Sequence, residues 1–381
     1  MTTLYIHIGT PKTGTTAIQN FLLLNEKQLE SNGILHPHIE AEGIGEEFVS
    51  FRNARFLAYH SSKNGEEKEK IEDRIYTEGF NIIKKAALKS KKIVITDEVI
   101  WLRQNETENF WQKVKRDANA AGCEIKVIVY LRRQDLYIQA VWNQAVKRMT
   151  RLDQTFQYFL KKGAKKKNLD YYKSLNEIAE QIGKENVIVR VYEKKMLLQS
   201  EGIYRDFLEA IEEPMCREYQ IPKEDFNERL DGNYVEIKRL INQIPEYKQM
   251  SLDFMYQPIL MANKLKKPEK ASFFSSEEQE EFIKKYEESN RRVAEEFLGR
   301  RDGNLFAEPF EKLPQWEINA DTMYQDIILF YGELAVEQQR QIDDLKHEVS
   351  RLEWEMHNPF VHIVMLTKKV IIKICEKFQR K

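Results

Sequence analysis

The residues best suited to chemistry lie near the N-terminus, where positions 9–16 hold one lysine, two glycines and four threonines. A lysine ammonium and threonine hydroxyls donate hydrogen bonds to anions, and glycine lets an anion approach the backbone. An apolar, β-branched run at 4–8 precedes these residues, and a helical pattern at 17–25 follows them. The N–H groups and the positive dipole end of that helix would point at the same place. The stretch therefore predicts a strand, a phosphate-binding loop and a helix.

The spacing differs in one respect from the phosphate loop of nucleoside triphosphatases, G-x-x-x-x-G-K-[ST]. Gly9 and Gly14 have the required separation, and Thr16 occupies the hydroxyl position. Thr15 stands where that loop has its lysine, and Lys12 lies before the second glycine instead. A lysine displaced in this way suits a shorter anion, such as a 5′-phosphate that carries one transferable group. The simpler alternative is a Gly/Thr turn that only begins a helix.

Residues 11–16 resemble the 5′-phosphosulfate loop of the sulfotransferase family, P-K-[TS]-G-[TS]-[TS], at every position. The resemblance covers roughly residues 1–310 and includes a Ser289-Asn290-Arg291 stretch that is similar to one in bacterial glycan-modifying sulfotransferases. It implies a P-loop NTPase-like sulfotransferase fold and the donor 3′-phosphoadenosine 5′-phosphosulfate (PAPS), with Lys12 stabilising the transferred group and no metal ion. The residues that it implies for donor binding are Pro11, Lys12, Thr13, Gly14, Thr15 and Thr16.

A second phosphate contact is expected at the end of the strand predicted over 124–131, where a double arginine begins at Arg132. The family places an arginine here to hold the 3′-phosphate of PAPS, and Arg132 matches it. Arginine suits this position because its charge is fixed and its donors are forked. Alternatively, the double arginine only caps the strand and the next helix at the surface.

The family pattern after this arginine is only partly present. It continues with a serine, where this chain has Ala140, and then with an aromatic residue, which Trp142 matches. The departure removes one hydroxyl donor to the 3′-phosphate. Asn143 or Gln139, about one helical turn away, are the candidates to replace that donor.

The acceptor hydroxyl has to lose a proton as it attacks, so a general base is expected. The first candidate is Glu98, which follows the strand predicted over 92–96 and has Asp97 as its neighbour. Repulsion between the two carboxylates would raise one pKa toward neutrality; alternatively, the pair only stabilises the start of a helix. The second candidate is His38, because some family members take their base from the strand after the first helix. The alternative for His38 is an ordinary loop histidine.

Strands alternate with helices along the first half of the chain, which predicts an α/β fold with a doubly wound parallel sheet and flanking helices. Ligands bind at the carboxyl edge of such sheets, so the loop at 9–16, Glu98 and Arg132 should share one edge. Residues 39–65 are irregular and predict a surface loop. The predicted strands lie at 4–8, 34–38, 92–96, 124–131 and 187–192, and the main helices at 66–90, 106–121, 134–149, 223–244 and 275–298.

The distribution of predicted strands and helices also divides the chain into a domain, a helical extension and a C-terminal tail. A sulfotransferase domain is expected over 1–310, with an α/β core at 1–212 and a mainly helical part at 213–310. A helical extension with a short coiled coil follows at 311–357, and a basic amphipathic tail at 358–381.

The chain has 381 residues and a formal net charge of −1, without the basic excess that would indicate a nucleic-acid partner. Its three cysteines are scattered, which indicates neither a disulfide framework nor a metal site. No secretory signal precedes the first predicted strand, and no apolar run is long enough to span a membrane. These observations predict a bacterial enzyme in the cytoplasm that does not bind nucleic acid.

The last part of the chain predicts two further contacts. Residues 338–356 have apolar residues at alternating spacings of three and four, typical of a coiled coil that forms a homo-oligomer. Another helix of the same chain is the alternative partner. Residues 360–381 combine an apolar face with lysines, the pattern of a helix on an anionic membrane surface. This pattern predicts a peripheral position at the inner face of the membrane.

Together these features predict an enzyme that moves a sulfuryl group from PAPS to a hydroxyl of a glycan or glycoconjugate by in-line transfer. Two other hypotheses stay open. A nucleotide-dependent kinase with a drifted phosphate loop would use Mg²⁺, with Asp97 as its candidate ligand. A non-catalytic scaffold of the same fold would assemble through the C-terminal helix, and Ala140 is the observation that favours it.

Overall fold

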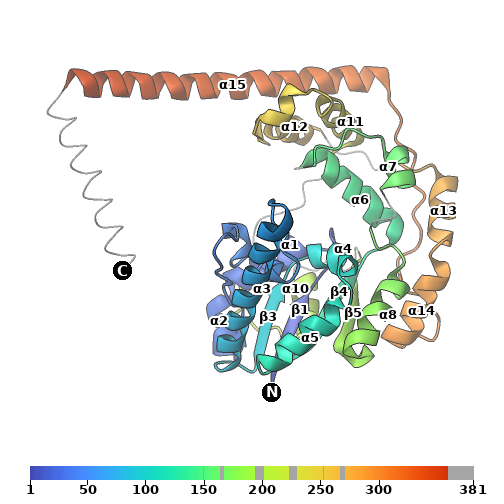
Figure 1. The fold of residues 1–381 in the computed structure, drawn as a ribbon. Helices are drawn as coiled ribbons and strands as arrows, with labels where there is room; N and C mark the ends of the chain where they lie inside the picture. The colour runs from blue at the N-terminus through green and yellow to red at the C-terminus, as the bar shows by residue number, and fades with distance from the viewer. Residues whose placement is uncertain are drawn as a thin grey trace. The chain divides into compact units, whose positions relative to one another are not determined.

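The structure is a computed structural model that describes residues 1–148, 150–163, 167–193, 201–222, 230–251, 253–266 and 271–358. Its strands are β1 Thr2–His7, β2 Ile34–Leu35, β3 Lys92–Thr96, β4 Cys123–Leu131 and β5 Val187–Val191. They form a parallel sheet in the order β2-β3-β1-β4-β5 (Figure 1). The predicted parallel α/β sheet is therefore confirmed.

The register of the three central strands brings their carboxyl ends to one edge of the sheet. His7, the last residue of β1, is paired with Thr96 at the end of β3 and with Ile128 in β4. The segments that follow β3, β1 and β4 therefore leave the sheet side by side. The phosphate loop, Glu98 and Arg132 all begin at this edge, as a ligand site in an open parallel sheet requires.

Helices cover both faces of the sheet. They are α1 Thr15–Leu24, α2 Glu26–Ser31, α3 Gly65–Ala87, α5 Phe110–Ala120, α8 Tyr171–Ile182, α10 Gly202–Ala210 and α14 Glu287–Leu298. On one face Leu4 and Ile6 of β1 belong to a core with α3, α5, α8 and α14. On the other face Tyr5 packs with α1, α2 and α10. Because both faces are buried, the strands are almost continuously apolar.

The predicted helix over 275–298 consists of two helices. The first is α13, Ser276–Lys284, and its start is a capping box in which Ser275 and Glu278 exchange hydrogen bonds at 3.0 and 3.1 Å. The second, α14, ends at Gly299, whose φ of 65° is one that glycine adopts without strain. The remaining helices of this part of the chain are α4 Val99–Arg103, α6 Gln134–Lys147, α7 Phe156–Lys162, η1 Glu46–Phe48, η2 Arg55–Ala58, η3 Gln104–Glu106 and η5 Lys184–Asn186.

The prediction that residues 39–65 form a surface loop is wrong for the central part of this segment. Two 3-10 helices, η1 and η2, lie in this segment, and residues 53–58 are all buried. Phe56 packs edge-on against a phenylalanine ring of α3. The side chain of Asn53 accepts a hydrogen bond from the N–H of Thr96 at 2.9 Å. Residues 53–58 therefore belong to the core at the carboxyl edge of β3, whereas most of residues 40–47 and 60–65 are exposed.

The chain divides into two compact units. The unit with the sheet comprises Met1–Arg229 and Lys270–Trp316, and the other comprises Leu230–Glu269 and Glu317–Lys381. The helices of the second unit are α11 Gly232–Ile241, η6 Glu246–Gln249, α12 Asp253–Lys264 and α15 Ala320–His357.

This division differs from the predicted one mainly at Leu230–Glu269, which the prediction placed in the sulfotransferase domain of 1–310 and which belongs to the second unit together with the helix that follows Glu317. In the second unit α12 packs along α15, and α11 contacts both helices. A helix pair that is separated by a long stretch of sequence thus shares one core. No local pattern reveals such a pairing, because helical periodicity predicts an apolar face but not its partner.

The C-terminal tail cannot be compared with its prediction. Residues 359–381 lie outside the described part of the chain, so the membrane contact of 360–381 stays a prediction. Among the helices that are described, none combines the length and the apolar character needed to cross a membrane.

Candidate active site

The segment between β1 and α1 has the tight conformation of an anion-binding loop. Gly9, Lys12 and Gly14 have positive φ values of 57°, 70° and 77°. The hydroxyl of Thr13 donates to the carbonyl of Thr10 at 2.5 Å and holds the turn closed. The N–H of Thr10 donates to a carbonyl of β4 at 2.9 Å, which fastens the loop to the neighbouring strand.

Both glycines of this loop are required by their surroundings. At Gly14 a Cβ atom would collide with the side chain of Ile203 at the start of α10. At Gly9 a Cβ atom would lie 3.0 Å from Thr15 Oγ1 and 3.3 Å from the Cβ of Glu98. The last distance places Glu98, from the end of β3, directly beside the loop.

Several hydrogen-bond donors of the loop have no acceptor among the residues that the structure describes. The first hydrogen bond of α1 joins the N–H of Ile18 to the carbonyl of Gly14 at 3.0 Å, so the N–H groups of 15–17 precede any intrahelical acceptor. The hydroxyls of Thr10 and Thr15 are buried and have no partner among the described residues. A phosphate or sulfate group bound at this helix start would satisfy both sets of donors.

Lys12 supplies the positive charge of the loop. Its Nζ donates a hydrogen bond to Oε1 of Gln144 in α6 at 2.7 Å. Burial lowers the pKa of Lys12 to about 8; the carboxylate of Glu98 opposes this shift, and Arg148 and Arg132 reinforce it. Because the amide of Gln144 is neutral, this hydrogen bond orients the ammonium without neutralising it.

Asp97 is an anchor for two arginines. It is fully buried, and its carboxylate accepts hydrogen bonds from Arg55 Nε at 2.6 Å and from Arg52 Nη2 at 2.8 Å. It also accepts the N–H of Val99 at 2.9 Å, at the start of α4. Both carboxylate oxygens are therefore engaged by the protein itself.

Glu98 is less tightly held than Asp97. Its side chain is 26% exposed and lies 3.3 Å from Arg52 Nη2. A second contact joins it to Gln19 Nε2 in α1 at 3.5 Å. Burial and the charge of Asp97 raise the pKa of Glu98, against the opposing effect of Arg52. A carboxylate with a raised pKa beside the loop is a stronger base than an ordinary carboxylate, which suits Glu98 to accept a proton.

His38, the second base candidate, lies at the surface. Its Nε2 is 2.9 Å from a carboxylate oxygen of Glu26 in α2, and both side chains are partly exposed. The nearby His36 is buried, with its ring nitrogens 3.0 Å from two backbone carbonyls, and burial lowers its pKa. Of the two base candidates, the structure places Glu98 against the loop.

Arg132 approaches the loop from the other neighbouring strand, β4. Its Nη1 donates to the carbonyl of Lys12 at 3.1 Å. Its guanidinium carbon lies 5.8 Å from the ring centroid of Tyr192, within reach of a cation–π contact. The hydroxyl of Tyr171 donates to the carbonyl of Arg132 at 2.6 Å and fixes the backbone of this turn. The structure thus brings Lys12, Glu98 and Arg132 together around the start of α1.

Buried side chains hold the turn that carries Arg132. The next residue, Arg133, pairs with Asp135 at 2.8 Å. Gln134 and Asn290 of α14 exchange two hydrogen bonds, at 2.7 and 3.1 Å. The sequence singles out the stretch at 289–291 but does not predict that Asn290 supports the turn of Arg132. Gln134 and Asn290 are too far apart in the chain for a local pattern to indicate their contact.

One of the two candidates to replace the missing serine is committed elsewhere. Oε1 of Gln139 accepts hydrogen bonds from the N–H of Phe273 at 2.8 Å and from the hydroxyl of Ser272 at 3.2 Å. Its Nε2 donates to a backbone carbonyl of α6 at 3.2 Å. Asn143, by contrast, has a buried Oδ1 with no partner in the part of the chain that the structure describes. Because the polar groups of Gln139 already have partners, Asn143 is the remaining candidate, and its side-chain NH₂ group would be the donor.

Arg52 and Arg55 are site residues that the sequence does not predict. Their segment has neither strand nor helix periodicity, so nothing local marks it as part of the core. The one available signal is their spacing of three residues, which places two guanidinium groups on the same side of a helical turn.

The parallel sheet and the glycine- and threonine-rich loop that follows β1 define an α/β fold with a candidate anion-binding loop at the carboxyl edge of its sheet. No protein-family profile matches the chain. An uncharacterised protein of Archaeoglobus fulgidus is 28% identical to it over 189 residues. The match covers 48% of this chain and 48% of that relative, about half the length of each.

Two solved structures are similar to parts of the chain, each at 12% identity. The sulfotransferase from Alicyclobacillus acidocaldarius matches over 65% of this chain and 96% of its own, with a TM-score of 0.36. The sulfotransferase domain from the Synechococcus PCC 7002 olefin synthase matches over 74% of this chain and 94% of its own, with a TM-score of 0.34. TM-scores this low assign no activity, so a function has to be argued from the residues of the site.

Proposed function

We propose that this protein is a sulfotransferase that moves a sulfuryl group from PAPS to a hydroxyl of a glycan or glycoconjugate. The observation that carries the proposal is the placement of Lys12. It lies ahead of the second loop glycine, is buried enough to lower its pKa to about 8, and has Glu98 and Arg132 as charged neighbours. A cation, a base and a second cation around one helix start are the groups that in-line sulfuryl transfer requires.

The residues at the loop fit such a donor. The N–H groups of 15–17 and the hydroxyls of Thr10 and Thr15 offer hydrogen bonds to the 5′-phosphate and the sulfuryl group. Arg132 offers a fixed charge and forked donors to the 3′-phosphate. Asn143, about one helical turn from Ala140, offers its side-chain NH₂ group as the donor in place of the missing serine. The proposed donor site thus consists of these groups together with Pro11, Lys12, Thr13, Gly14 and Thr16.

In the proposed reaction the acceptor oxygen attacks sulfur while the bond between sulfur and the bridging oxygen of the 5′-phosphate breaks. Glu98 accepts the proton of the acceptor hydroxyl, and its raised pKa makes it a stronger base than an ordinary carboxylate. Lys12 stabilises the negative charge that develops on the bridging oxygen. Adenosine 3′,5′-bisphosphate leaves with that oxygen, and the acceptor becomes a sulfate ester.

The surroundings of Asp97 favour sulfuryl transfer over the kinase alternative. A kinase needs a carboxylate that can hold Mg²⁺ beside the phosphates. Asp97 was the candidate for that function, but both of its oxygens are paired with Arg52 and Arg55 in a fully buried position. Binding a metal ion there would first require these two ion pairs to break, at a cost of several kcal/mol.

The acceptor and the location belong to the same proposal. A glycan acceptor is supported by the similarity of the Ser289-Asn290-Arg291 stretch to bacterial glycan-modifying enzymes. The tail at 360–381 would hold the enzyme at the inner face of the membrane, on the cytoplasmic side, where it could reach a lipid-linked glycan. Liposome co-sedimentation of the full chain and of a chain that ends at Asn358 tests the membrane contact: salt-sensitive binding should disappear in the shorter chain.

Titration calorimetry with three nucleotides tests the proposed donor. Adenosine 3′,5′-bisphosphate should bind without a metal ion and more tightly than either adenosine 5′-phosphate or ATP with Mg²⁺. Tighter binding of ATP with Mg²⁺ would favour the kinase. Incubation with radiolabelled PAPS and a panel of polysaccharides then tests transfer. Binding of the bisphosphate without transfer to any acceptor in the panel would favour the non-catalytic scaffold.

A further inference from the structure

The long helix α15 uses one face to pack within its own unit. Phe330 and Leu334 on this face are buried, and so is Asp326. The carboxylate of Asp326 accepts hydrogen bonds from Asn233 of α11 at 2.8 Å and from Lys266, just after α12, at 2.5 Å. These contacts account for the N-terminal part of α15; the residues of the same helix from 338 to 354 are exposed in the part of the chain that the structure describes.

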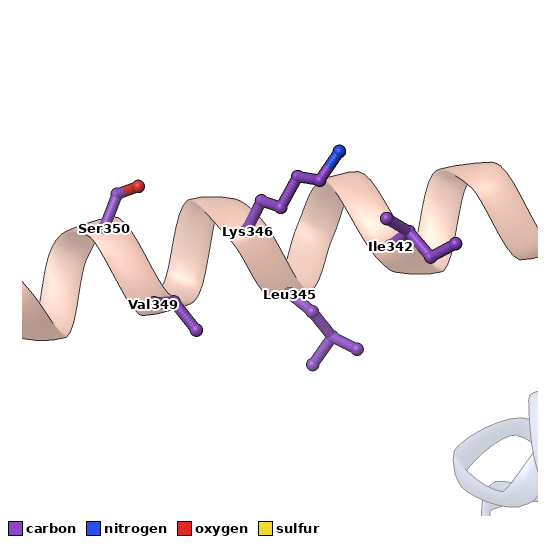
Figure 2. A pocket seen from close by; sticks show the side chains of 5 residues that line it. All are labelled: Ile342, Leu345, Lys346, Val349 and Ser350. Atoms are coloured by element: carbon purple, nitrogen blue, oxygen red, sulfur yellow. The ribbon is translucent and has the colours of Figure 1, made fainter.

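A second apolar face runs along the same helix and is exposed. Its side chains, which we call the seam, are each between 46% and 72% exposed: Ile342, Leu345, Val349, Leu352 and Met356. Figure 2 shows Leu345 and Val349 projecting from the same side of α15, with Lys346 and Ser350 on the other side. Every residue from 338 to 354 is exposed. In the described part of the chain, nothing covers this face.

We propose that the seam is the interface of a parallel two-stranded coiled coil between two copies of this chain. The seam residues follow the heptad spacing, with Ile342 and Val349 at the a positions and Leu345 and Leu352 at the d positions. β-branched residues at a with leucine at d favour two parallel strands over three or four. The residue types at each position, and not only their apolar character, therefore select this partner.

Tyr324, Ile328 and Tyr331 are exposed and occupy the same heptad register nearer the N-terminus of α15, separated from the seam by Ala335 and Gln338. Tyr331 borders the buried face, since its ring centroid lies 5.1 Å from that of Phe330. All three side chains are nevertheless between 61% and 70% exposed. Helices in water gain most of their stability from packing an apolar face. The exposed end of α15 obtains that packing when a second copy binds.

The polar side of α15 disfavours the other available surface, an anionic membrane. Acidic residues, among them Asp343, Glu348 and Glu353, flank the seam together with basic ones. Lys346 pairs with Asp343 at 3.6 Å and Arg351 with Glu348 at 3.3 Å within the helix. A lipid-binding helix instead has a mainly basic polar face. A mixture of acidic and basic side chains suits a second copy of the same helix, because that copy also has side chains of both charges beside its seam.

The mass of the full chain in solution tests the proposal. Light scattering behind a gel-filtration column should give twice the 45.4 kDa of one chain. The double variant Leu345→Asp, Val349→Asp should give the mass of one chain, because two buried carboxylates per helix would oppose pairing. The matched control His347→Asp, Ser350→Asp, on the polar side of the same turns, should stay dimeric. A monomeric wild-type chain, or a seam variant that remains dimeric, overturns the proposal.

Disulfide cross-linking tests the parallel orientation. In a chain with Cys216→Ser and Cys375→Ser, the single substitutions Ile342→Cys and Met356→Cys are each oxidised and run on a non-reducing gel. A parallel, in-register pair brings like positions together, so both variants should form covalent dimers. In an antiparallel pair, two positions this far apart along the helix cannot both lie opposite their own copies. Dimers at one position only, or at neither, therefore overturn the parallel arrangement.

Discussion

The Nζ atom of Lys12 donates a hydrogen bond to Oε1 of Gln144 at 2.7 Å, which joins the loop after β1 to α6. The ammonium is therefore oriented before any ligand binds, and its partner is a neutral amide. A charge that is already in place does not have to be reorganised in the transition state, which makes its stabilising effect larger.

Replacing Lys12 by alanine should abolish transfer, because the cation at the breaking bond is lost. We expect a loss of about 2–4 kcal/mol in transition-state stabilisation, the range seen when a key electrostatic group is removed. Measured kcat/KM with PAPS and an acceptor gives this value. The midpoint of thermal unfolding should change little, since the ammonium faces the ligand site and not the core. As a control, Lys27→Ala on the exposed side of α2 should keep wild-type activity; wild-type activity in Lys12→Ala would remove Lys12 from the mechanism.

The pH dependence of kcat/KM should be bell-shaped. Lys12 acts in its protonated form and has a pKa of about 8, so activity should fall as the pH rises through this value. Glu98 acts in its ionised form and has a raised pKa, so activity should also fall as the pH drops through that pKa. In Lys12→Arg the guanidinium stays charged, so any remaining activity should persist to higher pH. An unchanged alkaline limb in that variant would assign the limb to another group.

Replacing Arg132 by alanine should weaken the binding of adenosine 3′,5′-bisphosphate much more than the binding of adenosine 5′-phosphate. Only the first nucleotide carries a 3′-phosphate that Arg132 could contact. Calorimetric titration of both nucleotides measures the two losses separately. The exposed Arg116→Ala is the matched control and should leave both affinities unchanged. Equal losses for the two nucleotides in Arg132→Ala would contradict the proposed contact.

Replacing Glu98 by glutamine keeps the shape of the side chain but removes its ability to accept a proton. We expect donor binding to be retained and transfer to be lost, as measured by calorimetry and by single-turnover assay. His38→Ala should stay active, because this ring lies at the surface with Glu26 as its partner. If Glu98→Gln is active and His38→Ala is inactive, His38 is the general base. If both variants are active, another segment supplies the general base.

Replacing Asp97 by alanine should destabilise the fold strongly. Arg55 is nearly buried and would lose its carboxylate partner, a change that typically costs roughly 3–5 kcal/mol of unfolding free energy. Urea denaturation measures this loss. The control is Glu66→Ala, which removes an exposed helical ion pair with Lys70 and should cost no more than about 0.5 kcal/mol. A loss in Asp97→Ala as small as in the control would show that Asp97 is not a structural anchor.

Local patterns in the sequence were sufficient to predict the parallel sheet and the loop at 9–16. The β-branched runs at the three central strands, and the small residues from Gly9 to Thr16, depend on neighbours within a few positions. Backbone sterics and the period of two or 3.6 residues act at that range, so they can be read without the fold. The parallel order and the shared carboxyl edge then follow from the alternation of strands and helices.

Only the tertiary structure decided which side chains meet at that edge. Glu98 lies beside Gly9 because β3 is the neighbour of β1, and Asn290 reaches Gln134 because α14 packs on the sheet face that α8 also covers. Arg52 and Arg55 belong to the site although the sequence of their segment shows neither strand nor helix periodicity. The sequence likewise predicted the seam of α15 but not the separate face at Phe330 and Leu334 that packs on the rest of its unit. Such pairings depend on the packing of elements far apart in the chain, and periodicity within one element carries no information about its partner.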